Sequence, residues 1–139
     1  MSETLDPIAI VRRVIECDNG RDAAGYRALL DVDYQSFVHG APSTRGIDEE
    51  VSALEKWWQA SSDVHLEPLA LYESENVVTL RYTLEGTNDG DFFGRPATGK
   101  HFSVENCTLL EVVGGRVRRA WRFSDTLGLM TQLGLASGT

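Results

Sequence analysis

Near the end of the sequence, titratable and polar side chains that could take part in acid/base chemistry lie close together: Asn106, Arg119, Trp121 and Asp125. A carboxyl group can remove a proton from a bound molecule and later return it. Partial burial beside Trp121 would raise the pKa of Asp125 toward the working pH. Arg119 and Asn106 could stabilise negative charge that develops on an oxygen. This set is therefore the first candidate for an active site.

Each of these side chains also has a plainer explanation. Asp125 could cap a helix that begins near Leu127, because Asp is a favoured capping residue. Trp121 could pack in the core, or its ring could line a flat ligand while its indole N–H donates to a carbonyl. Arg119 could pair with a pocket carboxylate or lie at the rim, since an unpaired buried guanidinium is costly. Asn106 could be a satisfied buried amide.

The register of the last hairpin decides which of these side chains share a face. Gly114-Gly115 suits a two-residue turn, and counting back from it places Glu111 opposite Arg118, a favourable charge pair. This register predicts an inner face that is mostly apolar but polar at its far end. Its predicted members are Val104, Asn106, Thr108, Leu110, Val112, Val117, Arg119, Trp121, Phe123 and Asp125.

Three further positions are candidate substrate contacts elsewhere in the chain. His39 follows an aromatic segment and begins a loop, where a pocket mouth is expected, and Phe93 lies in a Gly-bounded loop that could close over a hydrophobic ligand. Asn88 lies in the same loop. No His/Asp/Glu set has the spacing of a metal site, and no Gly-rich phosphate loop opens a helix. We therefore expect no metal and no nucleotide.

Two kinds of hydrophobic periodicity divide the chain. Helical spacing predicts helices over 7–18, 22–30 and 47–60, the last with Glu49, Glu50, Glu55 and Lys56 on its exposed side. Strand-like runs follow at 64–72, 76–86, 100–113 and 116–124, after a short strand at 34–39 and a loop at 40–45. Helices first and strands afterwards predict an α+β fold with the helices on one face of a curved antiparallel sheet.

Size, composition and charge limit the function classes. The 139 residues fit one domain over 1–139, with an ordered core from about 6 to 135. The net charge of −8 disfavours nucleic acids and anionic membranes as partners. Without a signal peptide or a long apolar run, we expect a soluble cytoplasmic protein, and the two cysteines, Cys17 and Cys107, to be buried thiols.

The segments GTNDGDFFGRPATG at 86–99 and GGRVRRAWRFSDTLGLMTQLG at 114–134 resemble the SnoaL-like polyketide cyclase family, within the nuclear transport factor 2-like group. The resemblance covers nearly the whole chain. It implies a cone-shaped α+β barrel, a homodimer joined through the outer sheet face around Cys107, Leu109 and Ala120, and no cofactor.

The same resemblance implies a reaction and a catalytic residue. Family cyclases close a ring of an aromatic polyketide ester by intramolecular aldol condensation, and the Trp-x-x-x-Asp pattern puts their acid/base at Asp125. Asn88 stands where family members commonly have His, so a role for that imidazole is missing here.

Other functions remain open from the sequence. A relative could isomerise or hydrate a polycyclic compound, or assist its hydroxylation, and an epoxide-opening member would be expected to place two acids around an arginine. A non-catalytic module that binds a hydrophobic polycyclic ligand is the alternative from another class.

Overall fold

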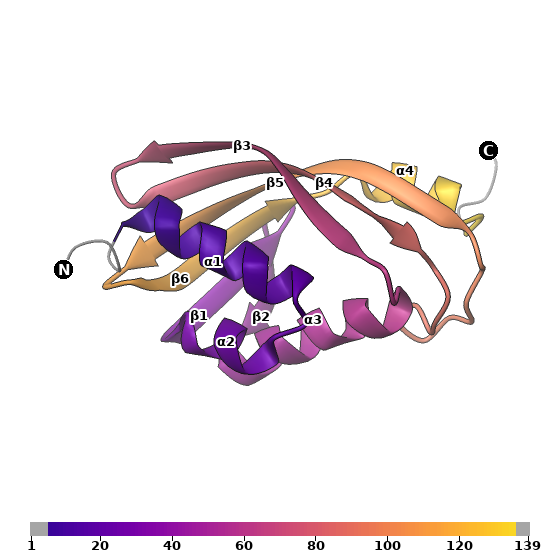
Figure 1. Cartoon of the computed structure of the whole chain (residues 1–139), viewed down its shortest axis with the longest axis horizontal. Helices are drawn as coiled ribbons and strands as arrows, with labels where there is room; N and C mark the ends of the chain where they lie inside the picture. The colour runs from indigo at the N-terminus through magenta and orange to yellow at the C-terminus, as the bar shows by residue number, and fades with distance from the viewer. Residues whose placement is uncertain (1–5, 136–139) are drawn as a thin grey trace.

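The computed structural model describes residues 6–135, which form helices and strands in the expected order (Figure 1). The elements are α1 (Pro7–Asn19), α2 (Ala23–Ala28), β1 (Leu30–Val38), β2 (Ala41–Arg45), α3 (Ile47–Ala60), β3 (His65–Ser74), β4 (Val77–Thr87), β5 (His101–Val113), β6 (Arg116–Phe123) and α4 (Thr126–Gln132). The predicted long strands are confirmed to within two residues at each end. The segment 40–45, expected as a loop, instead contains the short strand β2. No helix in the described part of the chain is long and apolar enough to cross a membrane.

The strands form one curved sheet in the order β2-β1-β6-β5-β4-β3. Most neighbouring strands are antiparallel, but β1 runs parallel to β6, with Ser36 opposite Ala120 and Phe37 opposite Trp121. The expectation of a purely antiparallel sheet is therefore wrong at this pair. A parallel pair needs a long crossover, and here all of β2 to β5 lies between the two strands in sequence.

Helices α1, α2 and α3 lie on one face of the sheet, and α4 lies at the far end of β5 (Figure 1). Helix α1 begins with Pro7 in its first turn, and the Asp6 carboxylate accepts a hydrogen bond of 3.2 Å from the Ile8 N–H. Its apolar side buries Ile10, Val11 and Ile15 against the sheet. The result is the cone-shaped α+β fold that was expected, with a mixed sheet that does not close.

A bulge in β6 changes the hairpin register beyond the predicted turn. Both turn glycines, Gly114 and Gly115, have positive φ angles of 61° and 81°, and Val113 pairs with Arg116 as expected. The next pair is Val112 with Val117, but after it Glu111 lies opposite Arg119. Arg118 is thus an extra residue on β6, and the predicted pairing of Glu111 with Arg118 is wrong.

Candidate active site

The bulge reverses which β6 side chains face the helices. Because strand side chains alternate, one extra residue moves every later side chain to the other face. Arg122 lies opposite Thr108 and faces the helices, whereas Trp121 lies opposite Leu109 and faces away. The placement of Arg119, Trp121 and Phe123 on the inner face is therefore wrong.

The displaced side chains make contacts on the outer face of the sheet. Arg119 forms an ion pair of 3.8 Å with Glu111, and the Trp121 ring stacks on Phe37 with centroids 6.1 Å apart. Phe123 is 48% exposed. Ala120, expected on the outer face, is fully buried on the inner one. Arg119, Trp121 and Phe123 therefore do not line the space between helices and sheet.

That space contains a cavity of about 280 Å³ bounded by α1, α2 and α3 on one side and by all six strands on the other. Much of its wall is aliphatic, including Val11, Val14, Leu54, Leu66, Leu80 and Leu84. Polar groups also reach it, namely Asp18, Tyr26, Glu50, Tyr82, Asn106, Thr108 and Arg122. An apolar cavity with a few convergent polar groups is the usual form of a site for a hydrophobic small molecule.

Glu50 and Arg122 form a buried ion pair in the wall of this cavity. The Arg122 guanidinium lies 2.7 Å from Oε2 of Glu50, whose side chain is 4% exposed. The Tyr26 hydroxyl donates to the same oxygen at 2.5 Å, and the Thr44 hydroxyl donates to Oε1 at 2.8 Å. Arg122 also contacts the Tyr34 hydroxyl at 3.4 Å. The Glu50 carboxylate therefore accepts hydrogen bonds from Arg122, Tyr26 and Thr44.

These contacts, together with burial, shift the pKa values of Glu50, Arg122 and Tyr34. Burial would raise the pKa of Glu50, but the Arg122 charge and the hydrogen bonds from Tyr26, Arg122 and Thr44 outweigh it and lower that pKa below its ordinary value. Although burial opposes the Arg122 charge, the Glu50 carboxylate raises the pKa of Arg122 well above its usual value. Burial raises the pKa of Tyr34 to about 12. At neutral pH the cavity thus contains a fixed carboxylate and a fixed guanidinium.

Asp18 is the second acid that reaches the cavity, from the last turn of α1. Its Oδ1 accepts a hydrogen bond of 3.0 Å from the Trp58 indole N–H on α3. Burial raises the pKa of Asp18, while the Trp58 hydrogen bond and the charges of Arg21 and Arg122 only partly oppose this effect. Two cavity carboxyls therefore have pKa values displaced in opposite directions.

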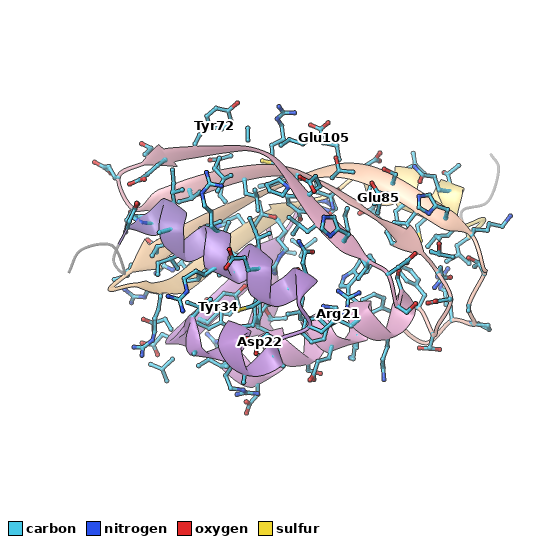
Figure 2. The ribbon with its side chains drawn as sticks, viewed as in Figure 1. Arg21, Asp22, Tyr34, Tyr72, Glu85 and Glu105 are labelled. Atoms are coloured by element: carbon cyan, nitrogen blue, oxygen red, sulfur yellow. The ribbon has the colours of Figure 1, made fainter. Side chains whose placement is uncertain are left out.

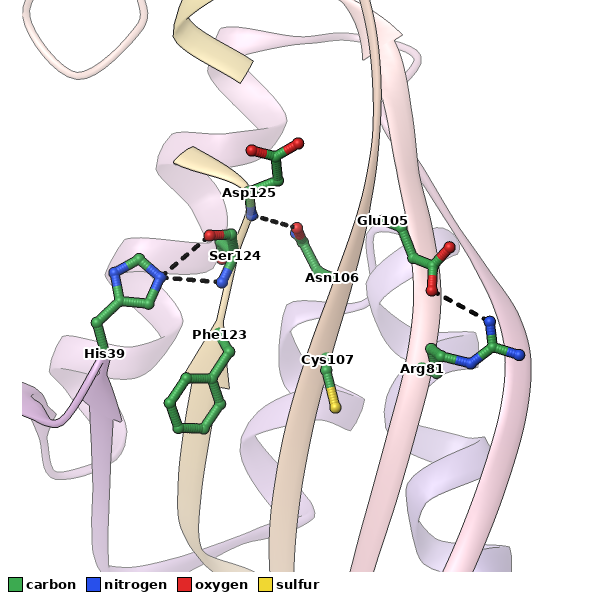
Figure 3. Close-up of a pocket in the computed structure, with 8 residues that line it drawn as sticks. All are labelled: His39, Arg81, Glu105, Asn106, Cys107, Phe123, Ser124 and Asp125. Carbon is green, nitrogen blue, oxygen red and sulfur yellow. Dashed lines mark hydrogen bonds and ion pairs between the residues drawn. The ribbon is translucent and has the colours of Figure 1, made fainter. Parts of the chain in front are cut away.

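Asp125 lies instead beside a shallow depression at the end of β6 (Figure 3). Its side chain is exposed and caps α4, with Oδ1 accepting 2.9 Å from the Gly128 N–H. His39 borders the same depression, where the Ser124 N–H donates to its Nε2 at 3.0 Å. The arrangement is the helix cap that the sequence offered as the plainer alternative for Asp125.

Asn106 lies between the two hollows and borders both. Its Oδ1 accepts a hydrogen bond of 3.1 Å from the Asp125 backbone N–H, as Figure 3 shows. The side-chain nitrogen has no protein partner within residues 6–135 and is free to donate to a bound molecule. Among the expected contacts near the hairpin, Asn106 is the one that faces the cavity.

The loop at 88–99 contains two expected substrate contacts, Asn88 and Phe93, and of these Phe93 borders the cavity. The Asn88 side chain is buried and fully bonded: it donates to the Ala60 and Gly90 carbonyls at 2.9 Å each and accepts from the Thr98 N–H and hydroxyl. It lines neither hollow and holds the loop against the end of α3. Phe93 does border the cavity, is 47% exposed, and makes an edge contact with Trp57.

Our sequence interpretation missed Asp18, Glu50 and Arg122. Glu50 was placed on the exposed side of its helix, yet it stands three residues after Ile47 and four before Leu54, which is the spacing of the apolar stripe. Asp18 similarly follows Ile15 by three residues. Helical periodicity could therefore have found both acids, whereas Arg122 was hidden by the bulge.

Comparison with known proteins shows what kind of protein this is. The family model for "SnoaL-like polyketide cyclase" matches residues 8–133. The chain belongs to the SnoaL-like polyketide cyclase family. This match confirms the resemblance carried by the segments at 86–99 and 114–134.

Individual SnoaL-like relatives agree with this assignment. The chain is 30% identical over 131 residues to the aklanonic acid methyl ester cyclase DnrD of Streptomyces peucetius, covering 91% of this chain and 90% of DnrD. It is 29% identical over 133 residues to the aklanonic acid methyl ester cyclase AcmA of Streptomyces galilaeus, covering 93% and 91%.

A solved structure supports the nuclear transport factor 2-like fold. AclR from Streptomyces galilaeus superposes with a TM-score of 0.85 at 23% identity, covering 96% of this chain and 84% of AclR.

Proposed function

We propose that this SnoaL-like protein closes a ring of an aromatic polyketide by intramolecular aldol condensation without a cofactor, inside the cavity between its helices and its sheet. The observation that carries the proposal is the cavity itself, which combines aliphatic walls with two carboxyls, a guanidinium and a free amide. Its aliphatic lining suits a flat, hydrophobic molecule. Relatives named as aklanonic acid methyl ester cyclases support the same class of substrate.

An aldol closure needs one group that carries a proton and others that stabilise negative charge. A carboxylate takes a proton from a carbon flanked by carbonyls, and the C–H electron pair becomes the enolate. The enolate carbon then forms a C–C bond with a second carbonyl carbon of the same molecule, whose C=O π bond breaks to give an alkoxide. The carboxylic acid returns its proton to that alkoxide, so the product has the same mass as the substrate.

The structure offers donors for the enolate and alkoxide oxygens. Arg122 reaches the cavity with a side chain that is 28% exposed, so its guanidinium is still open to a ligand beside Glu50. The unpartnered amide nitrogen of Asn106 is a second donor. In this proposal Arg122 and Asn106 stabilise the enolate oxygen, so Arg122 replaces Arg119 in the pair of donors that was expected.

Two carboxyls compete for the proton-carrying role. The resemblance implies Asp125, at the end of β6, and this assignment stays a prediction. The cavity itself contains Asp18, whose placement is treated separately below. Glu50 is unsuited, because the Arg122 charge and several donors hold it ionised.

The reaction is tested by mass spectrometry of the product. Aklanonic acid methyl ester, the compound in the relatives' names, serves as the probe ester. We expect the purified protein to convert it to a product of unchanged mass and altered chromatographic retention. Tight binding without any product would contradict catalysis and favour a binding module.

A second candidate function is the addition of water, for example to an epoxide of a polycyclic compound. It is favoured by one observation: two acids and an arginine line the same cavity, with Glu50 paired to Arg122 and Asp18 within the range of its charge. The sequence suggested only part of this arrangement. A hydrated product would be heavier than its substrate by one water, which the same assay detects.

A further inference from the structure

We propose that Asp18 is the proton carrier of this cavity, an inference that rests on the cyclase function proposed above and assigns its acid/base group. Asp18 occupies the C-terminal turn of α1 and lines the cavity. A group that moves a proton must touch the reacting carbon, and Asp18 is a cavity acid without a salt-bridge partner among residues 6–135.

One oxygen of Asp18 is held and the other is free. Oδ1 accepts the hydrogen bond from the Trp58 indole at 3.0 Å. Within the described part of the chain, Oδ2 takes no hydrogen bond. A carboxylate fixed through one oxygen presents the other in a defined direction, which is the arrangement that general acid/base catalysis requires.

The neighbours of Asp18 fix the end of α1. The Asn19 side chain both donates to the Leu66 carbonyl and accepts from the Leu66 N–H, each at 2.9 Å, and so ties α1 to β3. Arg21 bonds the carbonyls of Ser62 and Val64 and lies 5.8 Å over the Trp58 ring. Figure 2 shows Arg21 beside the helices, at this end of α1. These contacts hold the last turn of α1 in place and so restrict the movement of Asp18.

The charge environment separates Asp18 from Glu50. Burial raises the pKa of Asp18; Glu50 on α3 raises it further, whereas Trp58 on α3, Arg21 after α1 and Arg122 on β6 lower it. Glu50 is shifted in the opposite direction by its direct pairing with Arg122. When one acid serves as a fixed charge and another exchanges a proton, their pKa values are usually shifted in opposite directions.

Asp125 lacks this setting. Its side chain is exposed and its Oδ1 is used to cap α4. In Figure 3 the Asp125 carboxylate extends away from the amide of Asn106 that borders the cavity. The geometry therefore favours Asp18 over Asp125 as the acid/base.

The test compares Asp18→Asn with two variants that also remove one negative charge. Asparagine keeps the size of the side chain and an oxygen for the Trp58 bond, so Asp18→Asn should fold. We expect its kcat for the probe ester to fall by about 10²- to 10⁴-fold, while the ligand Kd from tryptophan fluorescence changes by less than about threefold, under 1 kcal/mol. Glu16→Gln, on the exposed side of α1, should retain the parental kcat. Asp125→Asn removes the competing candidate carboxyl and should lose less turnover than Asp18→Asn.

The outcomes separate this inference from the proposed function. Parental turnover in Asp18→Asn, or equal losses of turnover and binding, would overturn the assignment of the proton to Asp18. Loss of turnover in Asp125→Asn with normal turnover in Asp18→Asn would restore the expected residue.

A parent protein that binds the probe ester without converting it would remove the cyclase proposal but still leave Asp18 testable. In that case the ¹³C resonance of the Asp18 carboxyl is followed as the probe ester is added. We expect it to shift as the cavity fills, with Glu16 as the unshifted reference. A resonance that stays unchanged at saturating ligand would overturn the contact between Asp18 and the bound molecule.

Discussion

At the scale of single residues, the cavity depends on a buried charge pair. Arg122 and Glu50 compensate each other, and Tyr26 and Thr44 complete the bonding of the carboxylate. Such a pair contributes little when intact, but removing one partner leaves a buried charge without compensation. The pair therefore matters more for the integrity of the cavity than for net stability.

We predict that Arg122→Leu lowers the free energy of unfolding at pH 7 by about 3–5 kcal/mol, because Glu50 would remain buried and ionised. Urea denaturation followed by far-UV circular dichroism measures this change. A loss below about 1 kcal/mol would contradict this prediction, because it is the size expected for an exposed ion pair. Arg116→Leu, at an exposed position at the start of β6, is the control.

The same variant should reverse the response to acid. The folded-state pKa of Glu50 is lowered, so its stabilisation is present above the unfolded-state pKa and is lost as the pH falls through the folded-state pKa. The parent protein should therefore lose this contribution in acid. In Arg122→Leu, protonation of Glu50 should instead relieve the penalty, so the stability difference between the two proteins narrows as the pH falls.

At the scale of elements, the sequence predicted the helices and long strands but not the faces of the last strand. The Gly114-Gly115 turn was identifiable because few other dipeptides adopt two positive φ angles. The bulge at Arg118 has no comparable signal, since Arg-Arg fits a regular strand equally well. Because the extra residue Arg118 was not predicted, Trp121 was expected on the inner face, which Arg122 occupies instead.

Helix α4 provides a test of the role that the structure gives to Asp125. Asp125→Ala removes the hydrogen bond to the Gly128 N–H and should cost about 1 kcal/mol of unfolding free energy, whereas Asp125→Asn keeps a good cap and should cost much less. Thermal and urea unfolding of both variants measure the difference. Equal stability of Asp125→Ala and the parent protein would show that the cap is not a stabilising contact.

At the scale of the whole molecule, the α+β class could be predicted from the periodicity but the parallel pairing of β1 with β6 could not. Helices precede strands in the periodicity, which is enough to assign the class. The parallel contact of β1 with β6 joins segments about eighty residues apart, and no local pattern encodes such a contact. That contact brings β6 beside β1, and Arg122 of β6 pairs with Glu50 of α3 in the wall of the cavity.

The expected homodimer, joined through the outer face of the sheet, stays a prediction. Phe123 and Tyr72 are 48% and 60% exposed, and Figure 2 shows Tyr72 and Glu105 pointing away from the helices. Leu109 and the stacked Trp121 add apolar area to this surface. The partner contact expected around Cys107, Leu109 and Ala120 cannot include Ala120, because that side chain is buried on the inner face.

The central claim, that the substrate binds between the helices and the sheet, can be tested with the native tryptophans. Trp57 lines the cavity and the Trp58 indole donates to Asp18, while Trp121 lies on the outer face of the sheet, stacked on Phe37. The probe ester is titrated against Trp121→Phe and Trp57→Phe while tryptophan fluorescence is recorded. We predict that quenching persists in Trp121→Phe and is markedly reduced in Trp57→Phe. Quenching that disappears with Trp121 and persists without Trp57 would place the ligand outside the cavity and contradict the account.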